Sequence, residues 1–523
     1  MKLLGNRRRP NTARLIGLLA AIALVGAVGG CFREQAVVYR VAGAGPASPS
    51  AADSPPQPEA MTASTPTPAP ATTPSPTEAT PKKLPTSVVS KPIGFASTRA
   101  WLQQTHAELA QFLPAGSRGA LLTEQLADAD GAPRDVNAYY DVDPQRLHTV
   151  IHNLDGLKHS SQASGTKYAI DAPADPWPGF QDEWIPISNK LSISVRIGWA
   201  READGTTPRR APAIAILPGI YGDNSVMRTQ QIARALLAAG YHAVAVEQRG
   251  CGQTEKRYPQ TPMTFGTFEA GDLLVISEWL EDQPQVIASG LIGFCWGSNV
   301  ALVTGWEDGR RDDDPSITPM LRERLRPRSG RRHFSAGILV FSASLPFEEI
   351  CEKTAQKEWS FLGNPVLNKL QKETRTRQTR RGYQPVDGNL WRVIDAETGR
   401  DERAYPKIME DGLQYLRLYP YRDKPCGEKL EAIRVPTLIV HGCNDPLVDA
   451  QPLANVIAKT ENPLVAAIVL PGGGHVGFGP YSSEYFYGLI LRFFDPARGA
   501  AGFAASCAGL PSGGEGSGLS PAP

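Results

Sequence analysis

Three residues in the C-terminal half of the chain carry the side chains that acyl transfer needs: Cys295, Asp445 and His475. A thiolate is a strong nucleophile, and a histidine beside it takes its proton or forms an ion pair with it, which lowers the pKa of the thiol. An aspartate on the far ring nitrogen fixes the tautomer of that histidine and stabilises the charged imidazole. These residue types therefore predict a thiol nucleophile that attacks an acyl carbonyl, a histidine that shuttles the proton and an aspartate that orients the histidine.

Each of the three candidates follows an apolar stretch of the kind that forms a buried strand. These stretches are 286–292, 436–440 and 465–470. Cys295 lies between glycines in Gly293-Phe294-Cys295-Trp296-Gly297 and precedes a helix-like stretch. That pattern is typical of a nucleophile on a sharp strand-to-helix turn. Because sites in open α/β sheets lie at the carboxyl ends of the strands, we expect the three side chains to meet there.

The elements around these strands predict an α/β fold with a mostly parallel, doubly wound sheet. A continuous apolar strand at 213–217 is followed by a helix that closes at Gly240 and by another strand at 243–246. This alternation is typical of a parallel sheet covered on both faces by helices. Upstream, 183–200 alternates apolar and polar residues and predicts a hairpin, in which Pro186 restricts the first strand to an edge.

Two backbone N–H groups are the expected donors to the oxyanion: that of Trp296, directly after the nucleophile, and that of Ile220, after the strand at 213–217. Several alternatives remain open. Asp449 is a substitute for Asp445 as the acid. Cys251 and Cys443 also lie at strand ends, where either is a redox partner of the nucleophile or simply packed.

The stretch from about Glu183 to Pro496 resembles the α/β-hydrolase superfamily, whose chain order is nucleophile, acid, histidine. Within it, three motifs are most similar to the YheT-type hydrolases: Gln248-Arg249-Gly250-Cys251, Gly293 to Asn299, and Gly473 to Phe478. That branch normally has serine where this chain has Cys295. The resemblance implies a domain at 183–498, with a cap insertion at about 305–430 that selects the acyl group.

We therefore expect an acyl hydrolase, a carboxylesterase or thioesterase, that acts on a small acyl ester or thioester without a metal or organic cofactor. One alternative is a catalytically inactive hydrolase fold that binds a ligand or partner, because a change from serine to cysteine also marks retired sites. Another is a cysteine-dependent acyltransferase, because the cysteine turn also resembles those of polyhydroxyalkanoate synthases and dienelactone hydrolases.

The N-terminus predicts export and membrane attachment. Basic residues precede an apolar stretch from Leu15 to Val28, which is followed by Gly29-Gly30-Cys31. This segment, 1–31, resembles the bacterial lipoprotein signal and implies that Cys31 carries a lipid; an uncleaved membrane anchor is the alternative. Either way, we expect the protein in the cell envelope, tethered to the membrane on its periplasmic or outer surface.

The remaining segments carry no chemistry that can be assigned. Residues 32–91 are rich in Pro, Ala, Ser and Thr and predict a disordered linker, as does the composition of the tail at 499–523. Residues 92–182 form an N-terminal extension with weak patterns. Within the cap insertion, Cys351 and Cys426 are one candidate disulfide, since export permits such bonds. A net charge of +1 gives no indication of nucleic-acid binding.

Overall fold

The computed structural model describes residues 97–115, 118–143, 154–163, 176–310, 332–345, 365–382 and 429–495. The chain divides into two compact units, Met1–Ser87 and Val88–Pro523, and all the described residues belong to the second. The predicted signal with Cys31, the linker at 32–91, the tail at 499–523 and the candidate disulfide between Cys351 and Cys426 lie outside the described residues.

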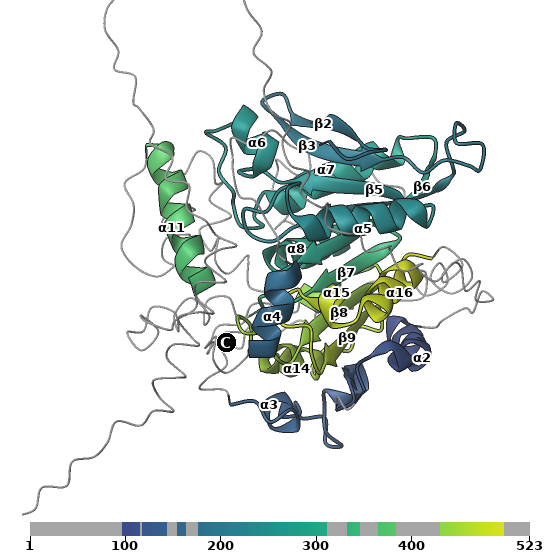
Figure 1. Cartoon of the computed structure of the whole chain (residues 1–523), viewed down its shortest axis with the longest axis vertical. Coiled ribbons are helices and arrows are strands. Elements are labelled where there is room, and N and C mark those ends of the chain that lie inside the picture. Colours follow the sequence, from purple (N-terminus) through teal and green to yellow (C-terminus); the bar gives the residue numbers. More distant parts are fainter. Residues whose placement is uncertain are drawn as a thin grey trace, which may run out of the picture. The chain divides into compact units, whose positions relative to one another are not determined.

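The described part is built on a nine-stranded sheet with the order β1-β9-β8-β7-β6-β4-β5-β3-β2 (Figure 1). All pairs from β5 through β4, β6, β7 and β8 to β9 are parallel, whereas β1, β3 and β2 pair antiparallel at the two sides. The mostly parallel α/β sheet is therefore confirmed. The strands are β1 (Leu121–Leu122), β2 (Gln181–Ser188), β3 (Leu191–Gly198), β4 (Ala211–Leu217), β5 (His242–Glu247), β6 (Val286–Phe294), β7 (Gly337–Phe341), β8 (Thr437–Gly442) and β9 (Val465–Leu470).

Helices cover both faces of this sheet, which explains why β4, β5, β7, β8 and β9 are buried along their whole length. Along β4, Ala213, Ala215 and Leu217 join one core cluster with α7 (Glu269–Glu281) and α8 (Trp296–Gly309). Ile214 and Ile216 join a second cluster on the other face. That second cluster contains side chains of α2 (Thr98–Leu109), α5 (Met227–Ala238) and α16 (Ser483–Phe493).

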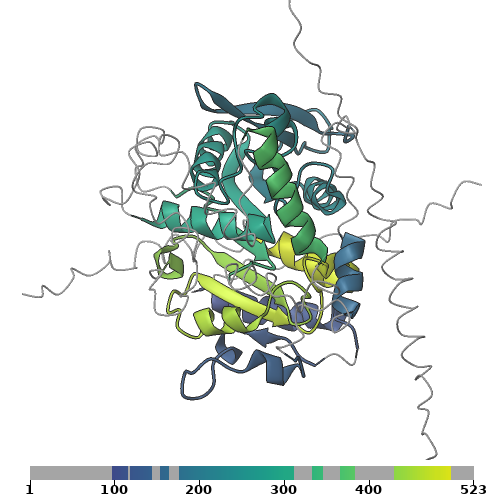
Figure 2. The same ribbon diagram turned by 90° about the vertical axis from the view of Figure 1, so that its left-hand side faces the viewer.

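Shorter helices lie nearer the strand ends. They are α3 (Val136–Tyr139), α4 (Leu154–Ala163), α6 (Gly252–Arg257), α14 (Gln451–Ile457) and α15 (Phe478–Tyr481), with single 3₁₀ turns at Ala110–Phe112, Thr123–Gln125 and Lys429–Ala432. Figure 2 shows α11 (Pro365–Arg380) in green, in front of the sheet. Among the described helices, none is both long and apolar enough to cross a membrane.

The predicted hairpin is present as β2 and β3, and β2 is an outermost strand of the sheet. Pro186 lies in β2, and the pairing register shifts between Pro186 and Ser188. A proline has no N–H to donate to a neighbouring strand, so this edge position is the one that it tolerates.

Helix α8 continues to Gly309, and β7, which lies within the predicted cap range of about 305–430, is a central strand between β6 and β8. The predicted N-terminal extension, 92–182, contributes a strand to the same sheet. Its β1 pairs with β9, and Trp101 of α2 packs against Phe493 with ring centroids 5.4 Å apart. Weak local patterns hid this, since these elements are held by long-range contacts.

Candidate active site

Cys295 is the whole connection between strand β6, which ends at Phe294, and helix α8, which begins at Trp296. Its backbone has φ 54° and ψ −120°, a region that L-residues other than glycine rarely adopt. Such strain is characteristic of functional turns, where the surrounding structure over-determines the backbone. The predicted strand-turn-helix placement of Cys295 therefore matches the observed geometry.

The two glycines of the motif let three backbone segments approach closely. A side chain at Gly293 would overlap the carbonyl oxygen of Gly297, the second residue of α8. A side chain at Gly297 would overlap the carbonyl oxygen of Pro218, which follows β4. The turn is therefore sharp enough to present Cys295 at the sheet edge, beside the loop after β4.

Asp445 and His475 meet at the same edge. The Nδ1–H of His475 donates to Oδ2 of Asp445 over 2.8 Å, and Asp445 is fully buried. The other carboxylate oxygen accepts the backbone N–H groups of Leu447 and Val448, at 2.8 and 3.0 Å. Both oxygens are thus engaged, and the carboxylate holds one tautomer of the imidazole in place. Asp449, the alternative acid, instead accepts the N–H of Gln451 over 2.9 Å.

The far nitrogen of His475 is left to the sulfur of Cys295. No nitrogen or oxygen atom of the described residues makes a hydrogen bond with Nε2 of His475. The two side chains perturb each other's pKa nonetheless. Burial acts to lower the pKa of His475, but the negative charges of Asp445 and Cys295 outweigh it and raise the pKa to about 10.

The thiol and the carboxyl shift in the opposite direction. Burial acts to raise the pKa of Cys295, but the charge of His475, a hydrogen bond from it and the N–H of Trp296 bring the pKa below its ordinary value of 9.0. Burial likewise acts to raise the pKa of Asp445, and the charge of His475 lowers it overall. These shifts favour the thiolate form of Cys295, the imidazolium form of His475 and the carboxylate form of Asp445.

The other described cysteines differ sharply from Cys295. All three described cysteines are free thiols, but Cys295 is partly exposed, whereas Cys251 and Cys443 are buried. Burial raises the pKa of both buried thiols to about 12. Cys443 donates from Sγ to the carbonyl oxygen of Pro471 over 2.8 Å. These two are packed thiols in this structure, with no disulfide to Cys295.

The two predicted oxyanion donors lie on neighbouring segments. Leu217, at the end of β4, pairs with Gly293 at the end of β6, so the loop that carries Ile220 begins beside the nucleophile. A Cβ on Gly219 would lie 3.2 Å from Cβ of Cys295, which places this loop in contact with the turn. On the other side, the N–H of Trp296 points toward the sulfur.

The loop of His475 depends on residues that the sequence did not reveal. Three successive N–H groups, of Gly474, His475 and Val476, donate to Oδ1 of Asn444, Oγ of Ser160 and Oγ of Ser342, at 2.8, 2.8 and 3.1 Å. The position of Asn444, directly before the candidate acid Asp445, could have indicated its role. Ser160 and Ser342 had no such signal, because the first lies in a segment with weak patterns and the second follows a strand without a recognisable motif.

The described part of the cap range touches the loop after β4. In α11, Thr374 accepts a hydrogen bond from the Tyr221 hydroxyl over 2.8 Å, and Arg377 donates to the carbonyl oxygen of Gly250 over 2.7 Å. Arg377 also pairs with Glu255 and lies over the Tyr221 ring. This helix is therefore anchored to the segment that carries Ile220.

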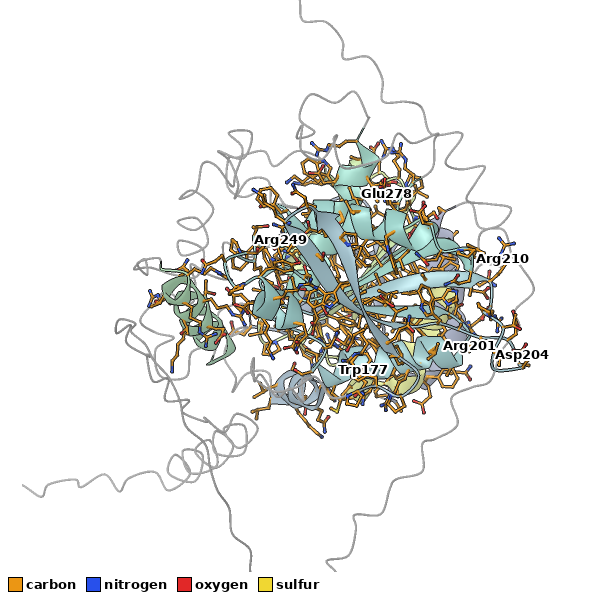
Figure 3. All side chains as sticks on the ribbon, turned by 90° about the horizontal axis from the view of Figure 1, so that it is seen from above. Trp177, Arg201, Asp204, Arg210, Arg249 and Glu278 are labelled. Carbon is orange, nitrogen blue, oxygen red and sulfur yellow. The ribbon has the colours of Figure 1, made fainter. Side chains whose placement is uncertain are left out.

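A second buried histidine–aspartate pair lies elsewhere in the domain. Nδ1 of His333 lies 2.5 Å from Oδ1 of Asp308, and its Nε2 lies 3.4 Å from Oε1 of Glu278, which is labelled in Figure 3. Arg249, labelled in the same view, forms a bidentate pair with Asp272 at 2.7 and 2.6 Å, which agrees with a structural role for its motif.

The chain is similar to several known proteins. The chain is 21% identical over 344 residues to the embryogenesis-associated protein EMB8 of Picea glauca, an alignment that covers 61% of this chain and 67% of that protein. The esterase Pf2001 of Pyrococcus furiosus superposes with a TM-score of 0.36 and 15% identity, covering 61% of this chain and 96% of its own. The alpha/beta hydrolase GrgF of Penicillium sp. sh18 gives 0.38 and 14%, covering 61% and 99%.

A sequence model of the alpha/beta hydrolase family matches residues 214–485. This range begins in β4 and ends in α16, and it contains the turn of Cys295, the strand end of Asp445 and the loop of His475. Together with the parallel sheet and the placement of these side chains at its carboxyl edge, the match shows that the chain belongs to the alpha/beta hydrolase family.

Proposed function

We propose that this protein is an acyl hydrolase that cleaves carboxylic esters or thioesters with Cys295 as nucleophile, His475 as proton shuttle and Asp445 as the orienting carboxylate. One observation carries the proposal. The thiol on the strained turn lies beside a histidine whose Nδ1 is held by a fully buried carboxylate, and the Nε2 of that histidine has no nitrogen or oxygen partner among the described residues. This arrangement supports the roles of nucleophile, base and orienting group.

The reaction follows from this arrangement. The Cys295 thiolate attacks the acyl carbonyl, and the N–H groups of Trp296 and Ile220 stabilise the negative oxygen that forms. As the carbon–oxygen or carbon–sulfur bond to the leaving group breaks, His475 delivers its Nε2 proton to that group. Water then attacks the acyl-cysteine while His475 accepts a proton. The carboxylic acid leaves as the carbon–sulfur bond of the thioester breaks.

The finer assignments are part of this proposal. The three motifs support assignment to the YheT-type hydrolases, with cysteine in place of serine. The N-terminal signal supports a lipid on Cys31 and a position in the cell envelope, where the enzyme acts on small acyl substrates. The anchoring of α11 to Tyr221 supports a cap that selects the acyl group, because this helix contacts the loop of one oxyanion donor.

The test is hydrolysis of ester and thioester series of increasing acyl length by the purified full chain under reducing conditions. We expect Cys295→Ala and His475→Ala to lower turnover to less than about a thousandth of the native rate, as removal of triad members does in other hydrolases. Cys251→Ala is the matched control, since it removes a thiol that is buried and outside the triad.

Three outcomes contradict the proposal. Turnover that survives in Cys295→Ala would show that another group is the nucleophile. A native protein that is inactive on every substrate, with a Cys295 thiol as unreactive as that of Cys251, would instead favour an inactive fold that binds a ligand. Product formation that requires an acceptor other than water would favour an acyltransferase.

A further inference from the structure

We propose that Ser160 is a positioning residue for His475, and that helix α4 of the N-terminal segment is a working part of the active site. The inference rests on the proposed function, because it concerns the same triad. Ser160 lies 315 positions before His475, in a region to which no chemistry could be assigned from the sequence. In Figure 1, α4 lies beside α15, the helix that follows the histidine loop.

The hydrogen bonds of Ser160 fix the direction of its hydroxyl. Its Oγ donates to the carbonyl oxygen of Gly156 over 2.5 Å, one turn earlier in α4. A hydroxyl has a single proton, so its lone pairs remain to accept, and the backbone N–H of His475 donates to them over 2.8 Å. Ser160 thus offers the histidine backbone an acceptor whose orientation is set by the helix.

Helix and loop also touch backbone to backbone. A side chain at Gly156 would overlap the carbonyl oxygen of Asn444, next to the acid. On the loop, a side chain at Gly474 would overlap the carbonyl oxygen of Gly156, and one at Gly477 would overlap the backbone of His159. Glycines on both sides therefore bring α4 against the two loops that carry Asp445 and His475.

The histidine loop needs such support because the residue after His475 has an unfavourable backbone. Val476 is β-branched and has a φ of 60°, whereas the positive φ of Gly473 and Gly474 is one that glycine adopts readily. Without Ser160, the N–H of a histidine backbone that is largely buried loses its acceptor, which destabilises that geometry. The imidazole would then move relative to the sulfur of Cys295.

The experiment measures how fast iodoacetamide alkylates the peptide that contains Cys295, as a function of pH and in the full chain, with steady-state kinetics alongside. In Ser160→Ala we expect the thiol to titrate at higher pH than in the native protein, because the imidazolium no longer stabilises the thiolate as well. We expect kcat about ten- to hundredfold lower with KM little changed, as for a misplaced catalytic group. Ser160→Thr keeps the hydroxyl and restores both values. Gln162→Ala, an exposed residue of the same helix, leaves them unchanged.

A merely structural serine would give a different result. If Ser160→Ala unfolds at a lower temperature but keeps the native titration of Cys295 and the native kcat, the positioning role is wrong. Ser160→Cys, similar in size but a weak acceptor, supplies the same readout if the alanine variant does not fold. The alkylation profile does not depend on turnover. A native protein without hydrolysis therefore refutes the proposed reaction, while a shift confined to the Ser160 variants still supports the contact.

Discussion

Among the described residues, two buried histidines have Nδ1 within hydrogen-bond distance of an aspartate, and they lie at opposite edges of one sheet. His475 follows β9 and lies at the carboxyl edge, whereas His333 precedes β7 and lies at the amino edge. Their Nδ1 atoms are 2.8 Å from Asp445 and 2.5 Å from Asp308. By the geometry of the pair alone, the two are nearly interchangeable.

What separates them is the group at the second ring nitrogen. Nε2 of His333 faces another carboxylate, that of Glu278, and the side chain is 1% exposed. Nε2 of His475 faces the thiol of Cys295, which is partly exposed. A histidine between two carboxylates has no nucleophile to activate. His333 instead links α7 and α8 to the segment that precedes β7. A buried pair becomes a catalytic unit when its free nitrogen meets a reachable nucleophile.

The largest expected effect comes from the same substitution made in each pair. Asp445→Asn should lower kcat by about a thousand- to ten-thousand-fold, because the amide holds the wrong tautomer of the imidazole. Asp308→Asn should leave the kcat of the folded protein within about twofold. Steady-state kinetics with one ester substrate checks both, and a large loss in Asp308→Asn would break the distinction between the pairs.

The next effect is on stability, and here we expect the larger change in the His333 pair. His333→Ala should lower the free energy of unfolding by about 3 kcal/mol, because it removes the imidazole from between two buried carboxylates. Urea unfolding at pH 7 measures this change, and the remaining folded protein should keep its kcat. Stability equal to that of the native protein would mean that the His333 pair contributes nothing to the fold.

The smallest effect concerns the pH dependence of the thiol. Because the pKa of Cys295 is below 9.0 and that of His475 is about 10, the native thiolate–imidazolium pair persists until the pH falls through the first or rises through the second. In His475→Ala the charge is gone while burial remains, so the pKa of Cys295 should rise above 9.0. In His333→Ala it should not change.

Iodoacetamide alkylation of Cys295 between pH 5 and about 10 distinguishes these cases, since only the thiolate reacts. The native rate should decline on the acid side, and the His475→Ala rate should increase throughout the range. Identical curves for native protein and His475→Ala would show that the histidine does not reach the sulfur.

The strand ends, and the three side chains that follow them, were predictable because both are encoded locally. An apolar stretch followed by a glycine and a reactive side chain predicts where each of β6, β8 and β9 ends. Parallel strands bring such ends to one edge of the sheet. The same reasoning could not choose between Asp445 and Asp449. That choice depended on which carboxylate lies 2.8 Å from the imidazole and which holds the start of α14.

The fold class and the placement of Cys295, Asp445 and His475 after strand ends follow from residue type and short-range spacing, so the sequence alone predicts them. The pairing of β1 with β9 and the hydrogen bond from the His475 backbone to Ser160 are visible only in the folded structure. These features rest on contacts between residues far apart in the chain. A hydrogen bond across 315 positions leaves no local pattern, because any helix with a serine would look the same.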